Sequence, residues 1–153
     1  MSMLVMLAAA AALQATTPAD PASPEAVAVM VPVNGVFAAL AAKDGALITP
    51  HLAPEARLTA VVARPDGSQI IRRMSGAEFA AGLQPGGPAL EEVMPDPIIA
   101  IDGDIAMVWG RYVFKIDGAI SHCGSDHFDL IRRDGVWLIT GLTWNQTTTG
   151  CER

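Results

Sequence analysis

One stretch of the chain decides the fold: residues 98–147, whose sequence is IIAIDGDIAMVWGRYVFKIDGAISHCGSDHFDLIRRDGVWLITGLTWNQT. It consists of strand-length runs rich in β-branched and aromatic residues, which favour β-strands. Asp102-Gly103, Asp117-Gly118 and Asp134-Gly135 separate these runs, and Asp-Gly pairs favour tight two-residue turns between antiparallel strands. The stretch therefore predicts a long antiparallel meander. Because its runs exceed the usual strand length of about five or six residues, we expect a strongly bent sheet that wraps over helices.

The residues before the meander predict helices and one hairpin. Ser23-Pro24-Glu25 combines a capping residue, a proline at the first helical position and an early acidic residue, so a helix should begin here. It should end near Lys43-Asp44-Gly45, and Pro32 should kink it or split off its first turns. Three further elements are expected: a short helical piece at residues 46–52, a hairpin with strands at 57–63 and 68–73, and a capped helix from Ser75 that carries Phe79 and Leu83. This order predicts one α+β domain.

Composition and motifs exclude several function classes. The chain has 153 residues and a formal net charge of −6. Its basic residues gather no further than the pairs Arg72-Arg73 and Arg132-Arg133, so it lacks the positive surface that nucleic-acid binding requires. The sequence contains no nucleotide-binding loop and no nucleophile elbow, and no cofactor is expected. No metal is expected either, because His122 and Cys123 point to opposite faces of one strand and cannot converge on an ion.

The N-terminus carries an apolar run over residues 4–13. As a helix this run would span about 15 Å, half of a bilayer's hydrocarbon core, so no membrane span is expected. Its length is typical of a signal peptide, which predicts a signal peptide at residues 1–15, a disordered leader at 16–23 and a folded domain at 24–151. The alternative is an Ala-rich terminal helix. Export predicts a periplasmic or secreted bacterial protein.

The chain has two cysteines, Cys123 and Cys151. In an oxidising compartment an even pair predicts one disulfide, here closing a loop of roughly thirty residues and fixing the C-terminus to the sheet. Two unrelated buried thiols are the alternative.

The order of elements resembles the cone-shaped α+β barrel of the nuclear transport factor 2-like superfamily, which includes ketosteroid isomerase, scytalone dehydratase and SnoaL-like polyketide cyclases. The resemblance covers residues 24–151 and is most specific over 105–145. It rests on Trp109, Tyr112, Phe114, Asp117-Gly118, 121–124, 126–130, 135–139 and Cys151. The closer resemblance is to a bacterial, often exported branch described as lumazine-binding. It implies a cone with a pocket on its concave, helix-covered face and a tendency to dimerise, but no particular reaction.

The predicted turns decide which side chains share a face, because side chains alternate along a strand. With two-residue turns, Trp109 opposes Asp126, and Asp126 opposes Thr143. We expect their face to be the concave one, because Phe128, Leu130 and Ile139 on it form a continuous apolar floor. The ligand pocket is then predicted to contain Met107, Trp109, Arg111, Phe128, Thr143 and Asn145 together with His122 and Asp126. A β-bulge would invert this assignment beyond its position.

Three functions fit this sequence. The favoured hypothesis is an exported homodimer, associated through its sheet, whose pocket binds a small apolar molecule. The second is an isomerase or dehydratase in which Asp126 and His122 form an acid/base pair and Trp109 is a stacking wall. A structural ion pair between Arg111 and Asp126 is the simpler explanation of those same residues. The third is an interaction module that uses the outer face around Tyr112 and Trp144.

Overall fold

The structure is a computed structural model that describes residues 17–152. The predicted signal peptide, residues 1–15, lies outside the described residues. The elements in chain order are α1 (Pro24–Ala42), α2 (Gly45–Ile48), the 3₁₀ helix η1 (Thr49–His51), β1 (Leu52–Ala63), β2 (Gln69–Ser75), α3 (Gly76–Gly82), β3 (Leu90–Val93), β4 (Ile98–Asp102), β5 (Ile105–Ile116), β6 (Ala119–Arg133) and β7 (Val136–Gln146).

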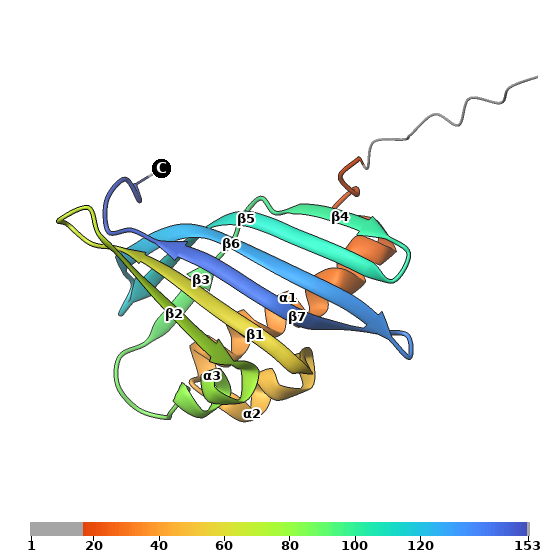
Figure 1. Cartoon of the computed structure of the whole chain (residues 1–153), viewed down its shortest axis with the longest axis horizontal. Coiled ribbons are helices and arrows are strands. Elements are labelled where there is room, and N and C mark those ends of the chain that lie inside the picture. Colours follow the sequence, from red (N-terminus) through yellow and green to blue (C-terminus); the bar gives the residue numbers. More distant parts are fainter. Residues whose placement is uncertain (1–16, 153) are drawn as a thin grey trace, which may run out of the picture.

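The strands form one seven-stranded sheet in the order β2-β1-β7-β6-β5-β3, and β4 also pairs with β5. β1 runs parallel to β7, whereas the other pairs are antiparallel. The sheet bends around α1, which crosses its concave side (Figure 1). This arrangement confirms the predicted α+β cone with N-terminal helices. The sheet does not close into a barrel, because the described strands β2 and β3 stand at its two edges.

α1 is the core helix of the cone. The Ser23 hydroxyl accepts a hydrogen bond from the backbone N–H of Ala26, and Lys43 ends the helix in the left-handed conformation. The predicted split at Pro32 does not occur: the helix continues past this residue, which is buried. By its length and its mean hydropathy of 1.7, α1 could cross a membrane. In this structure its buried face packs on the sheet.

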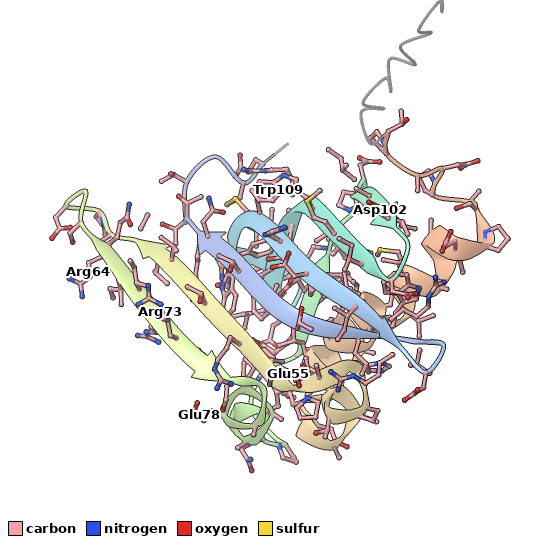
Figure 2. The ribbon with its side chains drawn as sticks, turned by 45° about the vertical axis from the view of Figure 1, so that its right-hand side comes forward. Glu55, Arg64, Arg73, Glu78, Asp102 and Trp109 are labelled. Atoms are coloured by element: carbon pink, nitrogen blue, oxygen red, sulfur yellow. A yellow bond between two sulfur atoms is a disulfide. The ribbon has the colours of Figure 1, made fainter. Side chains whose placement is uncertain are left out.

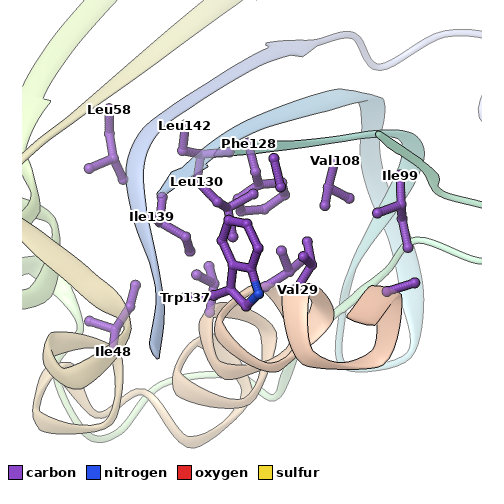
Figure 3. Close-up of a cluster of buried hydrophobic side chains, with 14 of the residues drawn as sticks. Val29, Ile48, Leu58, Ile99, Val108, Phe128, Leu130, Trp137, Ile139 and Leu142 are labelled. Carbon is purple, nitrogen blue, oxygen red and sulfur yellow. The ribbon is translucent and has the colours of Figure 1, made fainter. Parts of the chain in front are cut away.

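The core lies between α1 and the inner face of the sheet. In Figure 3, side chains of Phe128, Leu130, Trp137 and Ile139 converge from β6 and β7 on the helix side of the sheet. Phe128 meets Phe37 of α1 edge-to-face, with ring centroids 6.2 Å apart. Burial of this apolar layer is the main force that holds α1 against the sheet.

Two of the Asp-Gly turns form as predicted, and the third shifts by one residue. Ile116 pairs with Ala119, and Arg133 pairs with Val136. In the first hairpin Asp102 pairs with Ile105, so the turn residues are Gly103 and Asp104.

Two β-bulges change the register beyond these turns. Lys115 pairs with Ile120 but Phe114 with His122, so Ser121 is an extra residue in β6. Leu130 pairs with Ile139 but Asp129 with Gly141, so Thr140 is an extra residue in β7. An extra residue bends the strand and moves every later side chain to the opposite face.

The bulges overturn part of the predicted pocket. Tyr112 now lies opposite Gly124 and Trp144 opposite Asp126, which places both aromatic side chains on the inner face. The predicted pocket residues on β5 and β7 lie instead on the outer face: Met107, Trp109, Arg111, Thr143 and Asn145. Trp109 is 45% exposed, and in Figure 2 it lies at the top of the view while α2 and α3 lie at the bottom. The predicted β6 residues His122, Asp126 and Phe128 do lie on the inner face.

The predicted disulfide between Cys123 and Cys151 is present, with Cα atoms 5.5 Å apart. Cys123 also exchanges two backbone hydrogen bonds with Thr147, at 3.0 and 2.9 Å. Together these contacts fix the C-terminal segment to β6, beside the exposed side chain of Arg111.

Candidate functional site

A cavity of about 220 Å³ lies on the inner face, between the helices and the strands. Apolar and aromatic side chains make up most of its wall. Its lining residues are Val36 and Leu40 of α1, Phe79 of α3, Glu92 of β3, Tyr112 and Phe114 of β5, His122 and Asp126 of β6, and Leu142, Trp144 and Gln146 of β7. A larger hollow of about 480 Å³ lies on the outer face around Ile105 and Met107; it is shallow, and its ionisable lining residues are Asp102 and Asp129.

Asp126 is the polar centre of the inner cavity. It is 3% exposed, and its Oδ2 atom has no hydrogen-bond donor among the described residues. The predicted ion pair with Arg111 does not form, because the bulge at Ser121 places Arg111 on the outer face. A buried carboxylate without a cation is energetically costly, so this residue has a raised proton affinity.

Glu92 of β3 is the direct partner of Asp126. Their carboxyl groups share a hydrogen bond. Burial raises the pKa of Glu92 well above its usual range, and the neighbouring Asp126 raises it further. Burial raises the pKa of Asp126 to about 7, while the hydrogen bond from Glu92 acts in the opposite direction. Glu92 is therefore the protonated member of the pair, and its O–H donates a hydrogen bond to the Asp126 carboxylate. Above about pH 7 the pair carries one negative charge.

Sequence reasoning missed Glu92 because β3 is short and carries two acidic residues in succession. Side chains alternate along a strand, so only one of Glu91 and Glu92 can face outward. Glu91 does so and pairs with Lys115 at 3.1 Å. The alternation thus forces Glu92 inward, and this was the one signal in the sequence that pointed to the carboxyl pair.

Tyr112 closes the floor of the cavity next to the carboxyl pair. Its hydroxyl donates to the backbone oxygen of Asn145 at 3.0 Å. Burial, followed by the charges of Asp126 and Glu92, raises the pKa of Tyr112, so the phenol stays protonated. Gly124 lies opposite Tyr112, and a Cβ there would collide with the same Asn145 oxygen. Glycine at this position leaves room for the Tyr112 ring to reach across β6.

His122 lines the cavity as a neutral aromatic group. Its ring stacks on Phe114 with centroids 4.6 Å apart and meets Tyr112 edge-on at 5.9 Å. Burial lowers the pKa of His122, so the imidazole is uncharged at neutral pH. His122 and Asp126 lie four residues apart on one strand, about 13 Å between Cα atoms. They share the cavity, but the carboxyl group that hydrogen-bonds to Asp126 is that of Glu92.

Trp144 of β7 and Phe79 of α3 form another part of the cavity wall. Trp144 was expected on the outer face, yet it meets Phe79 of α3 edge-on with centroids 6.4 Å apart. The parallel pairing of β1 with β7 brings α3, which follows the β1–β2 hairpin, next to the end of β7. Such a long-range parallel pairing leaves no local sequence signal.

Comparisons with known proteins place this geometry in a known fold. No family model matches the chain, and no curated protein matches its sequence. A nuclear transport factor 2-like protein from Cytophaga hutchinsonii is 16% identical and aligns over 82% of this chain and 99% of that chain, with a TM-score of 0.63. A protein from Xanthomonas campestris, named for the association domain of calcium/calmodulin dependent protein kinase II, is 24% identical over 88% of this chain and 96% of that chain (TM-score 0.60).

A third similar structure is the β subunit of an aromatic-ring-hydroxylating dioxygenase from Novosphingobium aromaticivorans. It is 12% identical and covers 80% of this chain and 88% of that chain, with a TM-score of 0.65. These similarities establish that the chain has the nuclear transport factor 2-like fold. They do not single out the lumazine-binding branch, and a fold of this kind hosts many unrelated functions.

Proposed function

We propose that the inner cavity binds one small, mainly apolar molecule. The observation that carries this proposal is a cavity of about 220 Å³ whose wall is mainly apolar and aromatic, with polar groups from Glu92, His122, Asp126 and Gln146. An engineered apolar cavity of about 150 Å³ in another protein holds benzene, so this volume suits one ring with a short substituent. A pocket with an apolar wall and a few convergent polar groups is the usual form of a small-molecule site.

Filling the cavity should abolish binding. Val36→Phe adds a ring to a buried side chain of α1 that lines the cavity, and we expect the affinity for ethylbenzene to fall at least about tenfold. NMR titration checks this result, with the indole N–H of Trp144 as the local signal. Val31→Phe is the matched control, because Val31 lies on the exposed side of the same helix and is 56% exposed. Equal binding by both variants would exclude the cavity as the site.

A second candidate function is catalysis of proton transfer by an isomerase or dehydratase. The observation in its favour is the buried Asp126 carboxylate in the cavity, whose Oδ2 has no donor among the described residues; burial raises its pKa to about 7, where a carboxylate is an effective general base. Small ketones incubated with the protein in D₂O should then exchange their α-protons faster than in buffer, as followed by proton NMR. Exchange that is equally fast with Asp126→Asn would remove this residue from the reaction.

We also propose a homodimer through the outer face of the sheet. Ile98, Ile105 and Trp109 are exposed on this side, around the hollow of about 480 Å³. Exposed apolar surface of this kind favours association with a second copy. Trp109→Glu is expected to shift the mass measured by light scattering toward the monomer, whereas Val27→Glu, on the exposed side of α1, leaves it unchanged. A wild-type protein of monomer mass would contradict the proposal.

The cellular location that we propose is the periplasm or the exterior of a bacterium. The disulfide supports export, because such bonds persist in oxidising compartments. The mass of protein recovered from a periplasm tests the location and the cleavage site together, since removal of residues 1–15 leaves Thr16 at the N-terminus. An intact N-terminus at Met1 would contradict it.

A further inference from the structure

The inner cavity has an acidic end without any positive charge to balance it. Of the described residues that line it, none is a lysine or arginine. Arg111, the arginine of β5, lies on the outer face and is exposed. The polar end therefore presents a carboxyl pair, and above about pH 7 this pair carries one negative charge.

The protein itself leaves this charge short of hydrogen-bond donors. A carboxylate offers about four acceptor positions on its two oxygens, and the proton shared with Glu92 fills one of them. Oδ2 of Asp126 is buried and has no donor among the described residues. The Tyr112 hydroxyl, which lies nearby on β5, already donates to the Asn145 oxygen. A molecule that fills the cavity must therefore supply a hydrogen-bond donor. A molecule without a donor leaves the buried carboxylate unsatisfied, which weakens its binding.

We infer that the occupant is a primary amine with a single ring, whose ammonium group pairs with Asp126 while its ring lies against Trp144, Phe79 and Leu142. This inference rests on the proposed function and deepens it by naming the chemical class. An ammonium group supplies three donors and neutralises the charge of the pair. A carboxylic acid would bring a second negative charge beside Asp126, and a hydrocarbon would leave Oδ2 unpaired. The aromatic wall suits both the ring and the cation.

The charged state of the site sets how binding depends on pH. Asp126 loses its proton near pH 7, because burial raises its pKa to about 7. The other ionisable groups that face it are shifted toward their neutral forms: the pKa values of Glu92 on β3 and Tyr112 on β5 are raised, and the pKa of His122 on β6 is lowered. The lining residues of α1, α3 and β7 do not ionise. Amine affinity should therefore rise from pH 6 to pH 8, where the amine is still protonated, whereas a neutral ligand of the same shape should show no such rise.

Four probes of similar shape test the inference: benzylamine, benzyl alcohol, ethylbenzene and phenylacetate. Each is titrated into the full domain at pH 8, with the Trp144 indole N–H followed by NMR to place the ligand in the cavity. We expect benzylamine to bind at least about tenfold more tightly than ethylbenzene, benzyl alcohol to lie between them, and phenylacetate to bind most weakly. Asp126→Asn should remove the advantage of benzylamine while it retains ethylbenzene.

The outcomes separate this inference from the proposed function. Ethylbenzene or phenylacetate binding as tightly as benzylamine would overturn the amine class and leave the cavity as a binding site. No shift of Trp144 with any of the four probes would overturn the proposed function itself. If Asp126→Asn does not fold, the wild-type pH series decides the matter: an affinity for benzylamine that stays flat from pH 6 to pH 8 overturns the inference.

Discussion

The Asp126→Asn variant should become more stable relative to the wild type as the pH rises. Between pH 5 and pH 8 we expect the difference in the free energy of unfolding to grow by about 3 kcal/mol in favour of the variant. The reason is burial, which raises the pKa of Asp126 in the folded protein from 3.8 to about 7. Urea unfolding of both proteins at pH 5, 6, 7 and 8 measures this difference.

The sign follows from proton binding. At pH 5 the folded state holds a proton on Asp126, while in the unfolded state this carboxyl is ionised. Each rise in pH therefore favours the unfolded state, and wild-type stability is lost until the pH passes the folded pKa of about 7. The lowered pKa of His122 acts oppositely below about pH 6.5, because its unfolded form binds the extra proton there. Comparing variant with wild type cancels that contribution, since both proteins contain His122.

A matched control isolates the effect of burial from the effect of removing a charge. Asp129→Asn removes a carboxylate from the outer face of the same strand, where its side chain is 60% exposed. We expect the pH-dependent gain in Asp126→Asn and not in this control. Parallel curves for the wild type and Asp126→Asn would show that Asp126 is ionised in the folded protein without cost, and would contradict a raised pKa for this buried, cation-free carboxyl group.

Reducing the disulfide should cost about 3–4 kcal/mol of unfolding free energy. Cys123 and Cys151 lie 28 residues apart in the sequence, and the bond restricts the unfolded chain by closing this loop. Urea unfolding with and without a reductant at constant pH measures the loss. The bond also holds the segment after β7 against β6, so we expect the backbone amides of residues 147–151 to lose hydrogen-exchange protection on reduction.

The control for this experiment is Cys151→Ser, which replaces the half-buried partner and leaves the buried Cys123 in place. This variant should match the reduced wild type in stability, and the reductant should have no further effect on it. Equal stability of the oxidised and reduced wild-type proteins would show that the loop is already ordered without the bond.

The assignment of sheet faces shows where sequence reasoning succeeded and where it failed. On β6 the alternation of His122, Asp126 and Phe128 predicts their shared face correctly, because no extra residue interrupts the strand between them. On β5 and on the end of β7 the faces were inverted, because the bulges at Ser121 and Thr140 each add one residue. A bulge carries little sequence signal, since the bend it permits is needed only once the sheet curves over α1.

The residues of the candidate site were also predicted only in part from the sequence. Asp126 was identified from the sequence, but its predicted partners Arg111 and Trp109 lie on the outer face, and its true partner Glu92 comes from a strand that was not predicted. Glu92 and Asp126 lie far apart in the chain and meet because β3 and β6 both pair with β5. Contacts of this kind depend on strand order, which local patterns do not encode.

The sequence by itself determined the class of fold, the position of the main turns, the first helix with its caps and the cysteine pair. These features depend on short-range chemistry: the Asp-Gly turns, the Ser23 and Ser75 caps and the period-two alternation of the strands. The tertiary structure alone decided which side chains face the cavity and which carboxyl shares a proton with Asp126. Both outcomes follow from burial and register across the whole sheet, because one extra residue in a strand exchanges its inner and outer faces.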